Sequence, residues 1–196
     1  MIQTTLTKVD ETNKEIVKAI NQLSIRSVDG TIDKVLKHKL VNTSDSSAIA
    51  STNSETAYST TATLSKTLFK PGRIFRLTAS GILSTTGTPT IRFRVRIGTT
   101  NIVVFTAQTC PNNSSNQPFL IQAEISVKTI GTSGTVAGEG RLFFGSTTAT
   151  ELVVNATDTT VDTTPEQTLN VTAQWSVADA ANTTKIRNFI AELSDY

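Results

Sequence analysis

Hydrophobic and polar residues alternate along most of the chain from about residue 48 onward. In residues 119–127 every second position is apolar, and residues 75–81 and 169–177 repeat the pattern. A period of two places successive side chains on opposite faces of a β-strand, so each segment is predicted to bury one face. The pattern predicts further strands at residues 56–64, 90–97, 101–107, 135–145, 150–155 and 184–194.

Turn-forming residues separate these strands, and no helical pattern lies between them. Clusters of Gly, Pro, Asn and Thr occur at residues 70–72, 86–89, 111–113, 131–134 and 163–165. About nine short strands joined by regular turns are typical of an antiparallel sandwich or barrel. The predicted fold class is therefore mainly β, an antiparallel β-sandwich preceded by a short N-terminal α-helix and a hairpin.

The first 25 residues have a helical period instead. Five residues at spacings of 4, 3, 4 and 3 form a narrow seam between charged positions: Val9, Asn13, Ile16, Ile20 and Leu23. This pattern predicts an amphipathic helix. Either the helix lies on the β body, or it forms a short parallel bundle at an oligomer axis, with Asn13 fixing the register.

A boundary is predicted between the helical region and the β body. Asp29-Gly30 favours a tight hairpin turn, and the polar, turn-rich residues 38–47 are typical of a hinge. We therefore expect residues 1–40 to serve attachment or oligomerisation and residues 41–196 to form the sandwich.

Some predicted strands carry apolar residues on both faces. In the last one, strict alternation turns Ile186 and Ile190 to one face and Phe189 to the other. The adjacent pairs Val103–Val104 and Phe143–Phe144 have the same consequence. A monomer would expose these residues as apolar patches, so the pattern favours an oligomer.

Composition supports a β body and limits the partners. Threonine, which suits half-exposed strand positions, occupies 36 of 196 positions, while charged residues make up only 17%. The net charge of +2 provides no overall attraction for nucleic acid or an acidic membrane. Because the sequence shows neither a signal peptide nor an 18-residue apolar stretch, we expect cytoplasmic folding and no membrane span.

Three arginines alternate with apolar residues in residues 90–98. A strand turns Arg92, Arg94 and Arg96 to one side, about 6.6–7 Å apart. They form either a solvated face paired across strands with acids such as Glu124, or a contact surface for another subunit. A nucleic-acid groove would also need exposed aromatic residues and more basic residues beside them.

No catalytic pattern emerges, so we expect a protein that is not an enzyme. The histidine His38 lies between two lysines, and residues 131–135 and 138–145 fail the esterase and phosphate-loop spacings. A pair of carboxylates for sugar cleavage remains open, with candidates at strand positions Glu124, Glu139 and Glu151. Pairing with Arg92, Arg94, Arg96 or Arg141 is the favoured explanation of these acids.

Metal ligands and reactive thiols are also sparse, and no cofactor is predicted. Asp158 and Asp162 fit a Thr/Asp turn as well as a loose cation site. Cys110, followed by Pro111, is interpreted as an incidental loop thiol, with pairing between chains as the alternative.

Residues 68–98 and 111–144 together resemble the small β-sandwich domains of tailed-bacteriophage structural proteins. The resemblance consists of "KPG" at 70–72, "STTGTPT" at 84–90, a strand with alternating Arg, and "NQPF" at 116–119. It covers about residues 55–194 and does not include the first 40. The resemblance implies a jelly-roll-like domain, usually homotrimeric, displayed on a phage head or a tail appendage.

Such a protein would belong to the virion, after assembly in the bacterial cytoplasm. Its partners would be its own copies and other virion proteins such as the major capsid or tail proteins, with a host surface as a further candidate and with no nucleic acid and no membrane. Head decoration or a head fibre is slightly favoured over a tail appendage.

Two other functions remain open. A receptor- or glycan-binding module would use aromatic faces, and the Tyr and Trp residues are Tyr58, Tyr196 and Trp175. A capsule depolymerase would need two of the acids described above.

Overall fold

The computed structural model describes residues 39–145 and 150–194. The predicted N-terminal helix, with its seam from Val9 to Leu23, lies outside the described residues. The predicted hairpin at Asp29-Gly30 and His38 lie outside them as well. The division of the chain at residue 40 therefore stays a prediction.

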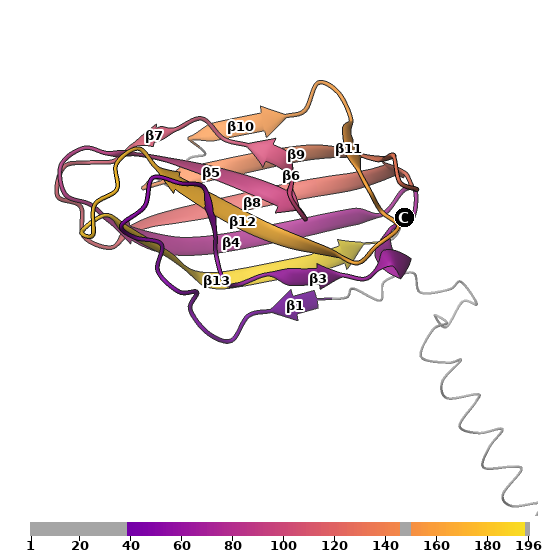
Figure 1. Cartoon of the computed structure of the whole chain (residues 1–196), viewed down its shortest axis with the longest axis horizontal. Helices are drawn as coiled ribbons and strands as arrows, with labels where there is room; N and C mark the ends of the chain where they lie inside the picture. Colours follow the sequence, from indigo (N-terminus) through magenta and orange to yellow (C-terminus); the bar gives the residue numbers. More distant parts are fainter. Residues whose placement is uncertain (1–38, 146–149, 195–196) are drawn as a thin grey trace, which may run out of the picture. The chain divides into compact units, whose positions relative to one another are not determined.

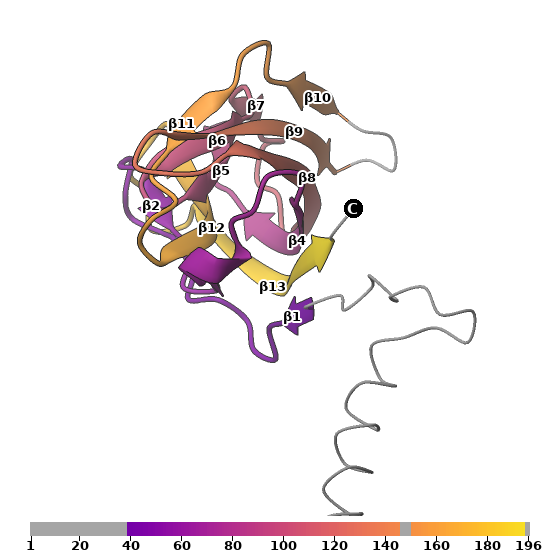
Figure 2. The ribbon, with the colours of Figure 1, turned by 90° about the vertical axis from the view of Figure 1, so that its right-hand side faces the viewer.

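Two antiparallel sheets pack face to face (Figures 1 and 2). A seven-stranded sheet has the order β1-β13-β4-β8-β9-β10, with β11 also paired to β9. A six-stranded sheet has the order β2-β12-β5-β6, with β3 also paired to β12 and β7 to β5. The bounds are β1 Lys39–Val41, β2 Thr56–Ala57, β3 Ala62–Leu64, the short 3₁₀ helix η1 Lys66–Leu68, β4 Ile74–Ser84, β5 Thr90–Ile97, β6 Thr100–Val104, β7 Gln108–Thr109, β8 Gln117–Thr129, β9 Gly134–Phe144, β10 Glu151–Val154, β11 Thr159–Val161, β12 Gln167–Trp175 and β13 Thr183–Ser194. The predicted antiparallel two-sheet fold is confirmed.

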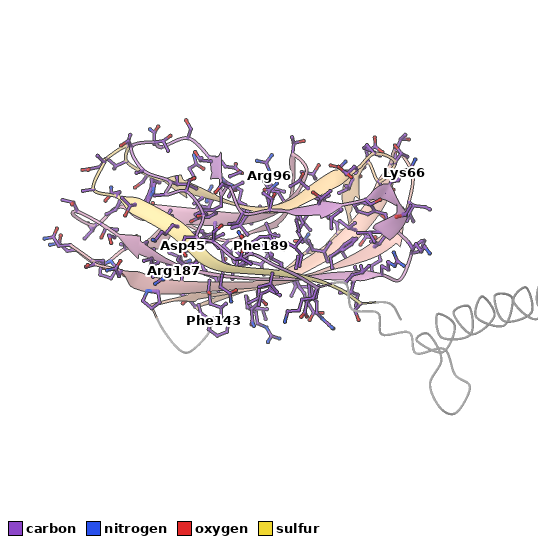
Figure 3. All side chains as sticks on the ribbon, turned by 90° about the horizontal axis from the view of Figure 1, so that it is seen from below. Asp45, Lys66, Arg96, Phe143, Arg187 and Phe189 are labelled. Atoms are coloured by element: carbon purple, nitrogen blue, oxygen red, sulfur yellow. The ribbon has the colours of Figure 1, made fainter. Side chains whose placement is uncertain are left out.

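The core lies between the inner faces of the two sheets, where Figure 3 shows densely packed side chains. Ile121 and Ile125 on β8, and Phe93 and Val95 on β5, are all 0% exposed. The ring of Phe93 stacks on Phe119 with centroids 4.7 Å apart. Full burial of a side chain of this size contributes about 1.5–3 kcal/mol, so these alternating positions supply much of the stability.

Two glycines on β9 allow the sheets to approach closely. A Cβ atom on Gly140 would lie 2.7 Å from Val103 Cγ1 and 2.9 Å from Phe105 Cζ. One on Gly138 would lie 2.6 Å from Ile102 Cγ2. The glycine-rich motif of β9 therefore makes room for side chains of β6 and the residue that follows it.

The edge of β13 is covered by β1 and by residues 42–49. The Ser46 N–H donates to the carbonyl of Ile186 at 2.8 Å, and the Ile186 N–H donates to Ser46 Oγ at 2.9 Å. The prediction of a hinge at residues 38–47 is wrong for the described part of that range. Its backbone and the Ser46 hydroxyl satisfy the hydrogen-bonding groups of a sheet edge, which water would otherwise solvate.

Asp45 adds ion pairs to this edge. Its Oδ2 lies 2.8 Å from Lys185 Nζ and 3.5 Å from Arg187 Nε, and Figure 3 shows Asp45 beside Arg187. The hydrogen bond from Lys185, together with the charges of both cations, holds the pKa of Asp45 below its ordinary value. The covering segment is therefore attached to β13 by charge as well as by backbone bonds.

A β-bulge changes the phase of β13. The register shifts between Ile186 and Asn188, so one extra residue, Arg187, interrupts the alternation. Ile186 and Phe189 consequently both face the core at 0% exposure, whereas Ile190 is half-buried on the outer face. The prediction that Ile186 and Ile190 share a face is wrong for this reason.

Substitution of Gly140 by valine should test the close approach of the sheets. The added side chain would meet Val103 and Phe105, so we expect a loss of about 1–3 kcal/mol in the free energy of unfolding. Urea denaturation followed by tryptophan fluorescence measures the change. Ala137→Val, on the outer face of the same strand, is the control and should shift the value by less than about 0.5 kcal/mol. Equal effects of the two changes would contradict the packing described here.

Candidate functional site

The side chains of Arg92, Arg94 and Arg96 on β5 lie on the outer face of the six-stranded sheet. The carboxylate of Glu55 pairs with two of them, Arg94 and Arg96. Arg94 is only 8% exposed, and its Nη1 forms an ion pair with Glu55 Oε2 at 3.2 Å, without hydrogen-bond geometry. Arg96 Nη1 donates to Glu55 Oε1 at 3.1 Å, and Thr172 Oγ1 donates to the same oxygen at 2.7 Å. Arg92 is exposed. Two of the three arginines are therefore bound to the segment that precedes β2.

Further bonds anchor the same guanidinium groups. Arg94 Nη2 donates to Gln174 Oε1 at 2.9 Å, and Arg96 Nη2 donates to the Thr99 carbonyl. Gln174 in turn donates to the Asn53 carbonyl at 3.2 Å. The arrangement holds the segment before β2 against the outer face, which is a structural use of the charges.

Glu124 does not share this face, contrary to the predicted grouping with Arg92, Arg94 and Arg96. It lies on β8 in the seven-stranded sheet, where its Oε1 accepts a hydrogen bond from Arg76 Nε at 3.0 Å. Alternation does not indicate the sheet to which a strand belongs, because the strands of both sheets have the same period. Figure 3 shows the two outer sides, with Arg96 on one and Phe143 on the other.

Replacement of Glu55 by alanine tests whether the arginine face is structural. Arg94 would keep a nearly buried charge without its counter-ion, so we expect the free energy of unfolding to fall by about 2–3 kcal/mol. The matched control is Glu124→Ala, which removes an exposed ion pair and should cost less than about 1 kcal/mol. Thermal and urea denaturation of both variants measures the difference. A smaller loss for Glu55→Ala than for the control would rule out the structural role.

The predicted acids are distributed over two places. Glu124 and Glu139 lie directly opposite each other on β8 and β9 and line a shallow groove of about 290 Å³ on the outer face of the seven-stranded sheet. A general acid needs a carboxyl group in apolar surroundings, whereas Glu139 is exposed and Glu124 contacts Arg76. The pair therefore lacks the environment of a sugar-cleaving site.

Glu151 has a structural contact instead. Its carboxylate accepts hydrogen bonds from the Thr106 N–H at 3.0 Å, from Thr106 Oγ1 at 2.9 Å and from Gln108 Nε2 at 3.2 Å. These bonds attach β10 to the connection between β6 and β7.

Neither a metal cluster nor a membrane helix is found in the described part of the chain. Asp162 Oδ1 accepts hydrogen bonds from the Thr164 hydroxyl at 2.7 Å and the Thr164 N–H at 2.9 Å, which lower the pKa of Asp162. This local turn follows β11, a strand that the sequence did not predict.

The described aromatic residues with polar groups are buried. Tyr58 and Trp175 are each 1% exposed. The Tyr58 hydroxyl bonds to Thr184 Oγ1 at 2.8 Å, and burial raises the pKa of Tyr58. Neither ring is available for stacking on a sugar, while Tyr196 lies outside the described residues.

Cys110 lies in the loop after β7, as predicted, but its side chain is buried in the core. It is 1% exposed, and burial raises its pKa to about 11. The thiolate is the reactive form, so little of it exists at neutral pH.

The thiol of Cys110 should accordingly react slowly with Ellman's reagent in the native protein at pH 8. We expect the reaction rate to rise at least about 100-fold in 6 M guanidinium, as unfolding restores access and an ordinary pKa. Absorbance at 412 nm measures both rates. Rapid native labelling, or a disulfide-linked dimer on a non-reducing gel, would contradict the burial.

A feature that the sequence showed only in part is the outer face of the seven-stranded sheet. Its apolar residues come from six neighbouring strands: Val41, Ile190, Ile82, Leu120, Phe143, Leu152 and Val154. Leu120 and Phe143 are directly paired, and Leu152 and Val154 are 61% and 64% exposed. The adjacency of Phe143 and Phe144 was the sequence signal for this surface, since Phe144 packs against the core.

No protein-family model matches the chain, and no curated protein is significantly similar to it in sequence. Among solved structures, the winged bean acidic lectin complexed with methyl-alpha-D-galactose is similar with a TM-score of 0.34 and 9% identity, covering 81% of this chain and 98% of the lectin chain. The infectious bursal disease virus Gx strain structure is similar with a TM-score of 0.25 and 7% identity, covering 83% of this chain and 43% of the viral chain. Neither likeness identifies a family or a function for this chain.

Proposed function

We propose that the protein is a non-enzymatic structural component of a phage virion. It forms a homotrimer, is attached to the particle by its N-terminal segment and displays the β-sandwich as a head, as capsid decoration or a head fibre. The observation that carries the proposal is the set of large apolar side chains on the outer face of a fully formed sandwich. A surface of this kind favours contact with another protein.

The connections between strands support the same proposal. When β2 is merged with β3, β6 is merged with β7, and β9–β11 are left out, eight strands remain. Their orders are 1-8-3-6 in one sheet and 2-7-4-5 in the other, which is the order of a jelly roll. Jelly rolls are common in viral capsid domains and also in lectins. The strand order therefore agrees with the resemblance to phage structural proteins without proving the function.

The groove on the outer face favours the alternative, a receptor- or glycan-binding module of a tail fibre. Arg76, Gln122 and Arg141 line this groove and offer hydrogen-bond donors to a sugar. Because both described Tyr and Trp rings are buried, we rank this function second. Binding to a host-polysaccharide array would promote it, and its absence together with particle labelling would remove it.

The structural role predicts a trimer of about three times 21.0 kDa in solution. Sedimentation velocity of the purified full chain at micromolar concentration measures this mass. Gold-labelled antibody against the chain should decorate purified particles of the phage that encodes it. A monomer at micromolar concentration would contradict the trimer, and unlabelled particles in the presence of labelled free protein would contradict the virion role.

A further inference from the structure

We propose that copies of the chain contact one another through the outer face of the seven-stranded sheet, with Arg141 of one copy paired with Glu139 of the next. The inference rests on the proposed homotrimer and assigns its interface. Phe143 and Leu120 lie beside this charged pair of positions and form the apolar part of the contact.

The apolar part is continuous across neighbouring strands. Leu120 and Phe143 face each other on β8 and β9, and Leu120 is also paired with Ser80 on β4, two residues from Ile82. All three apolar side chains are half-buried by their neighbours on the face and lie outside the core cluster. A partner that covered them would remove their remaining apolar surface from water.

The charges on the same face are close to balance, which favours a second copy as the partner. Four cations and three anions of its strands lie on it: Lys39, Arg76, Arg141, Lys185, Glu124, Glu139 and Glu192. Asp45 pairs with Lys185 at the β13 edge. Lys39 pairs with Glu192, and Arg76 pairs with Glu124. A face that is close to neutral offers little to a strongly charged partner such as nucleic acid, whereas its separate positive and negative positions can pair with those of another copy.

Glu139 and Arg141 are the charges left for an intermolecular contact. Both are exposed, and neither forms an ion pair within residues 39–145 and 150–194. They lie two residues apart on β9, so their side chains point to the same side. Around a three-fold axis close to β9, Arg141 of each copy can reach Glu139 of the next, which gives a closed ring of alternating charges.

The face is also large enough for a stable contact. Its four long strands, β13, β4, β8 and β9, contain 11 to 13 residues each. At about 3.3 Å per residue and about 4.8 Å between strands, they outline about 700 Å². The edge strands β1 and β10 add to this area. A standard interface buries about 800 Å² per partner, so the long strands together with the edge strands outline an area of that order.

The first experiment measures the oligomer mass of full-length variants by sedimentation velocity. Phe143→Glu and Leu120→Glu place a charge in the apolar part and should raise the dissociation constant at least about 30-fold. Val104→Glu is the control, because Val104 is 43% exposed on the outer face of the other sheet. Circular dichroism verifies the fold of each variant.

A second experiment changes the charges of Arg141 and Glu139. Both side chains are exposed, so the variants should still fold. Arg141→Glu and Glu139→Arg should each weaken the oligomer about tenfold through like-charge repulsion between copies. The double variant restores the pair with its signs exchanged, so its dissociation constant should return to within about threefold of the unchanged chain. Restoration is specific to a contact between copies, since a different protein would not carry the exchanged charge.

A third measurement reports contact directly, whatever else holds the oligomer together. Arg141→Cys should be cross-linked between chains by a short bismaleimide, whereas Arg92→Cys on the other outer face should not be. Cys110 does not interfere because it is buried.

The outcomes separate the inference from the proposed function. A trimer that survives all face variants and fails to cross-link at residue 141 overturns the interface and leaves the trimer. Loss of affinity without restoration in the double variant overturns the pairing between copies. A monomeric unchanged chain overturns both the trimer and its interface.

Discussion

The face-to-face packing of the two sheets is the interaction on which everything else depends. Each sheet has two faces, and a sandwich buries only the inner one. Alternating apolar residues on β4, β5, β8 and β12 fill the interior, and Gly138 and Gly140 allow β9 to approach β6. The sandwich therefore has two outer faces available for contacts, and these differ in a way that the strand patterns alone do not show.

Period-two alternation located most of the long strands, because a strand of eight or more residues with one buried face repeats the pattern several times. β5 was predicted at the bounds that the structure shows, residues 90–97. The misses have local causes. β1, β7 and β11 contain two or three residues, too few to display a period. In β13 the bulge at Arg187 adds one residue, so the residues beyond it face the opposite side from the one that strict alternation from Ile186 predicts.

The candidate sites were predictable only where a strand supplies all the information. That Arg92, Arg94 and Arg96 share a side follows from spacing, whereas their partner Glu55 lies in an irregular segment that only the tertiary fold brings to them. Glu124 was grouped with the wrong sheet because alternation does not encode sheet membership. Trp175 and Cys110 are both buried in the core, and this burial keeps the indole ring away from ligands and the thiol away from reagents.

The contrast between the outer faces explains why a contact surface would lie on one side. On the six-stranded sheet, Glu55 and its segment cover Arg94 and Thr172, so the central strand β12 is largely buried on both faces. On the seven-stranded sheet no described segment crosses the centre, and β9 and β10 extend the sheet beyond β8. This extension contributes Phe143, Leu152 and Val154 to the open face. A sandwich without the extension would present a narrower and less apolar surface, so the added strands supply the part of the face that the proposed contact uses.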